Sequence, residues 1–144
     1  MMSLQGSCRC RNILLHWQCR DYSLVPRACQ CAYCVRHAAA WVSKSGSALN
    51  VVIHDPRQHR VVEQGPAGAQ FHECAHCGDV VLVAAELDGE LYGAANARCV
   101  LNPRGFPGAV PTDSAALSVS ARRERWRLNW CSPLNIRVAP QTTH

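Results

Sequence analysis

Seven of the ten cysteines in this chain lie in three short clusters, and their spacing constrains the fold more than any other feature. They are Cys8 and Cys10, then Cys29, Cys31 and Cys34, then Cys74 and Cys77. Thiolates one or two residues apart on a tight turn can bind the same metal ion, whereas a disulfide between them would close a strained ring. The two outer pairs supply the ligands of one closed site, and the central three leave one ligand position open. Closed zinc sites are typical of structural roles, and open ones are typical of catalysis.

The alternative interpretation of so many cysteines is a secreted domain held together by disulfides. Residues 1–15 contain no apolar segment of the kind found in signal peptides, and they already include the first cysteine pair. The longest apolar run, residues 80–85, is too short to span a bilayer. We therefore expect a soluble, cytoplasmic protein with no membrane partner, because clustered cysteines in a reducing compartment favour metal binding.

Length and charge bound the remaining possibilities. The 144 residues fit a single domain, residues 1–144, small enough to gain stability from bound metal. Seven ionised thiols and two divalent ions would lower the formal net charge from +5 to about +2, so we expect no nucleic-acid partner. Four late arginines are typical of a solvated face, with contact to an anionic partner as the alternative. They are Arg122, Arg123, Arg125 and Arg127.

Apolar alternation and turn residues predict a mainly β fold. A hairpin is expected around Asp88 and Gly89, and a short helix over residues 35–41, directly after the central cysteine cluster. The other expected strands are residues 4–7, 13–17, 41–43, 49–53 and 60–63. Residues 102–113 hold three prolines and two glycines and predict an irregular connector. Weaker strand patterns follow at residues 115–120 and 126–130.

These motifs together resemble the glutathione-dependent formaldehyde-activating enzyme family, which also includes centromere protein V. The resemblance rests on Gly-Ser-Cys-Arg-Cys at residues 6–10, on Ala-Cys-Gln-Cys-Ala-Tyr-Cys-Val-Arg at 28–36 and on Phe-His-Glu-Cys-Ala-His-Cys-Gly at 71–78. A weaker similarity follows at residues 95–101. The family-like core is thus about residues 4–101, and residues 102–144 would be a connector and C-terminal extension.

The resemblance implies a β-tent zinc fold, shared with methionine sulfoxide reductase B and with Rab-binding accessory factors. It implies two Zn²⁺ per chain, a structural ion held by Cys8, Cys10, Cys74 and Cys77 and a catalytic ion held by Cys29, Cys31 and Cys34. Two positions depart from the family pattern: Gln30 replaces a common histidine, and Asp79 replaces a small or hydroxyl residue. Both departures lie near the expected metal sites and bear on the shape and charge of the substrate pocket.

A zinc ion with three thiolate ligands is a weak Lewis acid and suits the binding of an incoming thiol as thiolate. The resemblance accordingly implies a carbon-sulfur lyase-type enzyme that joins glutathione and formaldehyde into S-(hydroxymethyl)glutathione, or a related thiol and aldehyde. The alternative is a non-catalytic zinc scaffold that binds a protein partner. A third interpretation, methionine sulfoxide reduction, would require Cys99 as the redox cysteine.

Several other side chains have competing interpretations. Arg36 is the candidate to bind the carboxylates of glutathione, whereas Arg27 and Lys44 are expected to be ordinary surface cations. His37 follows the central cluster closely enough to close it as a Cys3His site, which would remove the open position. His76 is expected to face solvent.

The isolated cysteines and the tryptophans are expected to be buried. A cysteine outside a cluster usually packs as a small apolar side chain, and tryptophans usually belong to the core or to a sheet face. The residues concerned are Cys19, Cys99, Cys131, Trp17, Trp41, Trp126 and Trp130.

Overall fold

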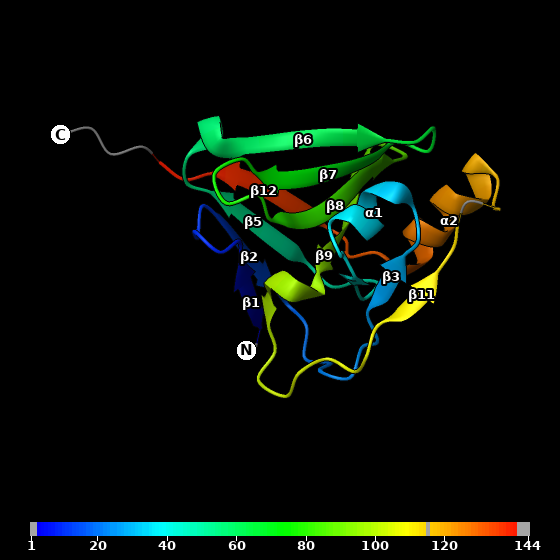
Figure 1. Cartoon of the computed structure of the whole chain (residues 1–144), viewed down its shortest axis with the longest axis horizontal. Helices are drawn as coiled ribbons and strands as arrows, with labels where there is room; N and C mark the ends of the chain where they lie inside the picture. The colour runs from blue at the N-terminus through cyan, green and yellow to red at the C-terminus, as the bar shows by residue number, and fades with distance from the viewer. Residues whose placement is uncertain (1–2, 115, 141–144) are drawn as a thin grey trace.

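Two β-sheets enclose one hydrophobic core in the computed structural model, which describes residues 3–114 and 116–140 (Figure 1). The first sheet has the strand order β10-β1-β2-β5-β12 and the second the order β11-β3-β4-β9-β8-β7-β6. The first contains β1 (Leu4–Ser7), β2 (Ile13–Trp17), β5 (Leu49–Ile53), β10 (Val100–Leu101) and β12 (Leu134–Val138). The second contains β3 (Arg27–Cys29), β4 (Trp41–Val42), β6 (His59–Gln64), β7 (Ala69–Cys74), β8 (Val80–Leu87), β9 (Glu90–Asn96) and β11 (Val110–Thr112). The expectation of a mainly β protein is therefore confirmed.

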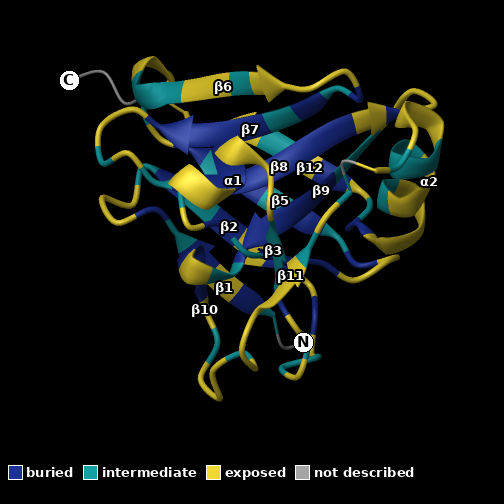
Figure 2. Cartoon of the chain, turned by 45° about the vertical axis from the view of Figure 1, so that its right-hand side comes forward, coloured by how far each residue is buried: buried dark blue, intermediate teal, exposed yellow. Residues whose placement is uncertain are grey.

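The burial of each strand follows its position between the layers. In β2, the side chains of Ile13, Leu15 and Trp17 are buried, while the intervening His16 is exposed. This alternation places one face of the first sheet against the core and the other in solvent. Strand β8 is instead buried at nearly every position, because the second sheet is covered on both faces, and the edge strand β6 remains exposed (Figure 2).

Two helices cover the face of the second sheet that points away from the first sheet. Helix α1 spans Ala32–Arg36 and helix α2 spans Val119–Asn129. A second core cluster lies beneath them and includes Tyr33, Phe71 and Trp130. Within the described ranges, no helix is long and apolar enough to cross a bilayer.

The local predictions for the hairpins are confirmed. Strands β1 and β2 are antiparallel around the first cysteine pair. Strands β8 and β9 are joined by the two-residue turn Asp88–Gly89, with φ of 53° and 81°. Both residues adopt the left-handed conformation that such hairpin turns require, and Asp-Gly supplies it at low cost.

The helix expected over residues 35–41 is misplaced, because it begins inside the cysteine cluster. The Cys31 sulfur accepts a hydrogen bond from the backbone N–H of Cys34 and caps the first turn. The helix ends at Arg36, and Ala38 adopts a positive φ of 51°. The chain must then extend, since Trp41 pairs with Asn96 in the second sheet.

Residues 102–140 are more regular than expected. Strand β11 pairs in parallel with β3, and β12 pairs in parallel with β5, so the segment adds an edge strand to each sheet. The weak strands expected at 115–120 and 126–130 are wrong where they are described, because residues 119–129 form α2; residue 115 lies outside the described residues. The helix is favoured by Ser118, whose hydroxyl caps it by accepting from the Ala121 N–H, and by its alanine, arginine, glutamate and leucine residues.

Candidate metal centres and the adjoining cleft

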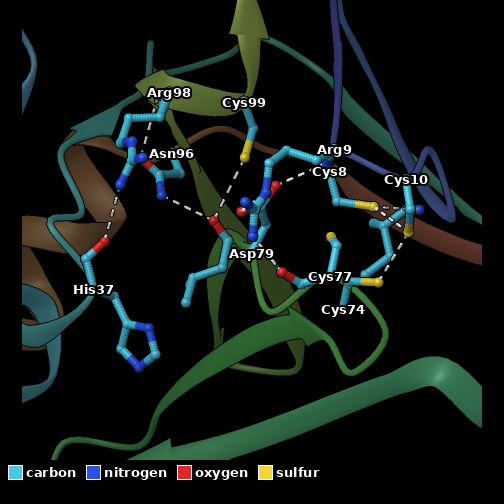
Figure 3. Close-up of polar contacts among 12 residues, drawn as sticks. Cys8, Arg9, Cys10, His37, Cys74, Cys77, Asp79, Asn96, Arg98 and Cys99 are labelled. Atoms are coloured by element: carbon cyan, nitrogen blue, oxygen red, sulfur yellow. Dashed lines mark hydrogen bonds and ion pairs between the residues drawn. The ribbon is translucent and has the colours of Figure 1, made fainter.

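The four-cysteine cluster joins two segments that are distant in sequence. Cys8 and Cys10 come from the β1–β2 turn, while Cys74 ends β7 and Cys77 lies in the following turn (Figure 3). The Sγ atoms of Cys8 and Cys10 are 3.7 Å apart, those of Cys10 and Cys74 are 3.4 Å apart, and all four lie within 4.8 Å of one another. A tetrahedral zinc with Zn–S bonds of about 2.3 Å requires S···S distances of about 3.8 Å, whereas a disulfide requires about 2.05 Å. The donor set and its spacing therefore fit a closed metal site.

Asp79 fastens the two turns of this cluster together. Its carboxylate accepts from the Arg9 backbone N–H at 2.8 Å and from Arg9 Nε at 3.1 Å, while Arg9 Nη2 donates to the Cys77 carbonyl (Figure 3). Asp79 thus links the two turns that carry the four-cysteine cluster. Desolvation raises the pKa of the Cys77 thiol, but backbone N–H groups of Asp79 and Cys10 outweigh it and lower that pKa to about 7.

The three-cysteine cluster forms where β3 passes into α1. Cys29 ends the strand, Cys31 caps the helix and Cys34 lies in its first turn, so one local fold brings their sulfurs within 4.8 Å. Cys34 is buried, Cys29 is half-buried and Cys31 is exposed. A hydrogen bond from the Cys34 thiol is the main cause that lowers the pKa of Cys29 to about 6, and the same bond raises the pKa of Cys34. The hydrogen bond therefore stabilises the thiolate of Cys29, the form that binds metal, and the thiol of Cys34.

In the described part of the chain, no fourth cysteine, histidine, aspartate or glutamate joins the three-cysteine cluster. His37, the residue considered for that position, lies elsewhere. Its Nε2 is 3.9 Å from Glu73 Oε2, and its ring is 4.4 Å from the ring of Tyr33. The backbone carbonyl of His37 also accepts from Arg98 at 3.4 Å (Figure 3). The geometry gives a three-ligand cluster and not a Cys3His site.

All three cysteines of this cluster line a cavity of about 380 Å³. Its walls come from β3, α1, the middle of the second sheet and α2, and they include five aromatic side chains: Tyr33, Trp41, Phe71, Trp126 and Trp130. Among the described residues that line it, none belongs to the four-cysteine cluster. Clefts of this size, with apolar walls and few polar groups, are typical of small-molecule sites.

The cations of this cleft differ from the one expected. Arg36 is exposed and does not line the cavity. The Cζ atom of its guanidinium lies 5.7 Å from the centroid of the Tyr33 ring. The arginines that line it are Arg27, Arg122 and Arg125. They come from two segments that are distant in the sequence. The one sequence signal for the cleft is that Arg122 lies four residues before Trp126 and Arg125 lies five residues before Trp130.

The late arginines are therefore not one solvated face. Arg123 donates at 2.7 Å to the carbonyls of Ala67 and Glu86, and Arg127 pairs with Asp88 at 2.7 Å. These contacts fasten α2 to the loops at the end of the second sheet. Arg122 and Arg125 face the cleft instead.

Glu73 is a buried carboxylate that the sequence analysis did not identify as important. It accepts from the Tyr33 hydroxyl and from Arg60 Nε and Nη2, the latter two at 2.9 and 2.6 Å. Burial raises the pKa of Glu73, but hydrogen bonds from Tyr33 and Arg60 lower it below its usual value. Because Glu73 precedes Cys74 and Tyr33 precedes Cys34, this contact connects the two clusters.

The remaining candidates lie largely where the sequence predicted. His76 is exposed, Gln30 donates to the Ala28 carbonyl at 2.8 Å, and Cys19, Cys99 and Cys131 are buried. Trp17, Trp41 and Trp130 are buried, and Trp126 is half-buried. Burial raises the pKa of Cys99 to about 12, which disfavours the redox role that sulfoxide reduction would require.

The chain matches no protein-family model, no curated protein and no solved structure. The resemblance to the formaldehyde-activating family therefore rests on the cysteine motifs themselves. The chemistry of the site follows from its geometry.

Proposed function

We propose that this protein is a zinc-dependent carbon-sulfur lyase-type enzyme that forms or cleaves a thiol–aldehyde adduct. The reaction would resemble that of S-(hydroxymethyl)glutathione synthase. The ligand set of the catalytic Zn²⁺ would be Cys29, Cys31 and Cys34, and the four-cysteine cluster would hold a second, structural Zn²⁺. The β-tent architecture and the cytoplasmic location belong to the same proposal.

One observation carries this proposal: the three-cysteine cluster lines a ligand-sized cleft, and the four-cysteine cluster does not. A structural ion needs no access, whereas a catalytic one needs an open position beside a substrate site. The three-cysteine cluster has both the smaller number of ligands and the access to a cleft. The four-cysteine cluster has four ligands and does not line the cleft.

The residues of the cleft have distinct tasks in such a reaction. A metal ion in the three-cysteine cluster would hold the sulfur of an incoming thiol as thiolate. The aromatic walls exclude water, and the hydroxyls of Thr112 and Ser114, which also line the cavity, are available to the aldehyde oxygen. The sulfur–carbon bond forms as the carbon–oxygen double bond becomes single, and the thiol proton is transferred to oxygen. Cleavage reverses these steps, and no electron donor or acceptor is required.

Metal content and cobalt spectroscopy test the proposal. The purified protein should hold two zinc ions, and Cys31→Ser should hold one with its far-ultraviolet circular dichroism unchanged. In the cobalt-substituted wild type, glutathione should alter the visible spectrum, and this change should be lost in Cys31→Ser. Formation of the adduct from glutathione and formaldehyde, followed by NMR, should be faster with the wild type than with Cys31→Ser.

A cobalt spectrum that no thiol alters would contradict the enzymatic proposal. It would favour the alternative of a non-catalytic zinc scaffold for a protein partner, in which a protein side chain completes the three-cysteine cluster.

A further inference from the structure

Three arginines in the cleft have no counter-ion within the described residues. Neither Arg27, Arg122 nor Arg125 forms an ion pair with a described carboxylate, although all three line the cavity. Arg27 Nη2 donates to Ser43 Oγ at 2.7 Å, and this bond fixes its guanidinium. The Nε of Arg122 is buried and lacks a hydrogen-bond partner in the described structure. Arg122 Nη2 does donate to the Ser114 carbonyl at 3.2 Å. Guanidinium groups without a carboxylate partner favour an anionic ligand, above all a carboxylate.

The charges of Arg27 and Arg125 lie close enough to affect each other. Burial is the largest cause that lowers the pKa of Arg27; the charge of Cys131 raises that pKa, and the positive charge of Arg125 lowers it by a smaller amount. Two like charges at one cleft repel each other, and an anion between them removes that repulsion. Because both arginines also line the cavity, an anion bound there would relieve this repulsion.

Flat aromatic side chains line the same cavity as the arginines and the cysteines. The rings of Trp126 and Trp130 are stacked at 4.6 Å with an interplanar angle of 11°, and the rings of Trp41 and Phe71 are 5.7 Å apart. Trp130 is buried and Trp126 is half-buried, so the indole of Trp126 is the more accessible of the two. Such faces bind flat apolar groups better than the polar backbone of a peptide.

We propose that the cleft binds an aromatic carboxylic acid that carries the reacting sulfur, with its carboxylate at Arg27 and Arg125 and its ring against Trp126. This inference deepens the proposed function, on which it rests for the sulfur end. It names a substrate class that differs from glutathione, whose body is polar and flexible. The specificity comes from α2, a segment outside the family-like core.

Four probes separate the parts of this inference. Para-mercaptophenylacetate has the thiol, ring and carboxylate, para-toluenethiol lacks the carboxylate, mercaptoacetate lacks the ring, and phenylacetate lacks the sulfur. Binding to the full-length, cobalt-substituted protein is measured by the visible spectrum and by quenching of tryptophan fluorescence. The complete probe should bind at least about tenfold more tightly than either truncated thiol, since each lost contact removes a charged hydrogen bond or a stacked ring.

Two matched variants on α2 locate the anion site. Arg125→Met should weaken binding of para-mercaptophenylacetate by about tenfold or more and leave para-toluenethiol almost unaffected. Arg127→Met is the control, because Arg127 pairs with Asp88 and does not line the cavity. Arg27→Met, at the other arginine of the proposed anion site, supplies a second test if Arg125→Met is unstable by circular dichroism.

The outcomes distinguish this inference from the proposed function. If glutathione and mercaptoacetate bind as tightly as the complete probe, thiol binding stands and the aromatic-acid inference is wrong. The inference is equally wrong if Arg125→Met retains the preference for the carboxylate. If no thiol alters the cobalt spectrum, the proposed function fails; phenylacetate that quenches the wild type but not Arg125→Met would still support the aromatic-acid site.

Discussion

Glu73 connects the two metal clusters through side chains rather than through the backbone. Glu73 is 4% exposed, and its carboxylate contacts Tyr33 in α1, His37 at the C-terminal end of α1, and Arg60 in β6. A buried carboxylate is costly unless its oxygens are satisfied, and here both are. Tyr33 is fixed in turn and packs against Phe71 at 4.1 Å, which holds α1 over the second sheet.

Replacing this carboxylate should be costly. Glu73→Gln keeps the volume but removes the charge that Arg60 binds, and we expect a loss of about 2 kcal/mol in the free energy of unfolding. Urea denaturation measures it. The control is Glu63→Gln on β6, which is exposed and should change the free energy by less than about 0.5 kcal/mol. Equal effects of the two substitutions would show that the network contributes nothing specific.

Helix α2 is held in place by hydrogen bonds to neighbouring loops rather than by the packing of a broad apolar face. Of its own residues, none is fully buried, and Trp130 follows directly after its end. Arg123 donates to the Ala67 carbonyl in the β6–β7 turn and to the Glu86 carbonyl near the end of β8. These bonds hold the tryptophan wall of the cleft in place before any ligand arrives.

Loss of these bonds should loosen the element without unfolding the domain. In Arg123→Met, the amides of Val119–Asn129 should exchange with solvent about five- to tenfold faster, because a local opening costs less free energy. Hydrogen-exchange mass spectrometry measures this rate. Arg127→Met should have a smaller effect, since Arg127 and Asp88 form an exposed ion pair of low energetic value. Unchanged exchange in Arg123→Met would contradict this account of how α2 is held.

At the scale of the whole molecule, the four-cysteine cluster ties the first sheet to the second. Cys10 and Cys74 are 64 positions apart, and a bound ion would close that long loop. The three-cysteine cluster, in contrast, spans only the local turn from β3 to α1. The two ions should therefore contribute very differently to stability.

Paired substitutions measure that difference. Cys10→Ser should lower the Tm of the zinc-loaded protein by at least about 10 °C, because a crosslink of this length is worth about 4 kcal/mol. Cys31→Ser should lower it by only a few degrees. In the wild type, a chelator is added stepwise up to one equivalent and the Tm is measured by calorimetry. This gives the same comparison of the two ions. Similar Tm losses in the two variants would show that both clusters are structural.

The sequence by itself determined the two cysteine clusters, many of the strands before residue 101 and the hairpin turns. Cys29, Cys31 and Cys34 are brought together by one turn, and the Asp88–Gly89 hairpin depends on two adjacent residues. Such features depend on neighbours in the chain, so their spacing is enough to predict them. The helix predicted over residues 35–41 begins three residues earlier in the structure, because the Cys31 side chain caps it within the central cluster.

Only the tertiary structure decided what surrounds the three-cysteine cluster. Arg36 is its neighbour in sequence but lies outside the cleft, while Arg27 and Arg125 line it from segments almost a hundred residues apart. Their approach depends on the pairing of β11 with β3 and on the contacts that fasten α2 over the second sheet. Those are sums of many weak long-range contacts, and no local pattern of residues encodes them. The cysteine clusters could therefore be predicted from spacing, and the shape and charge of the cleft could not.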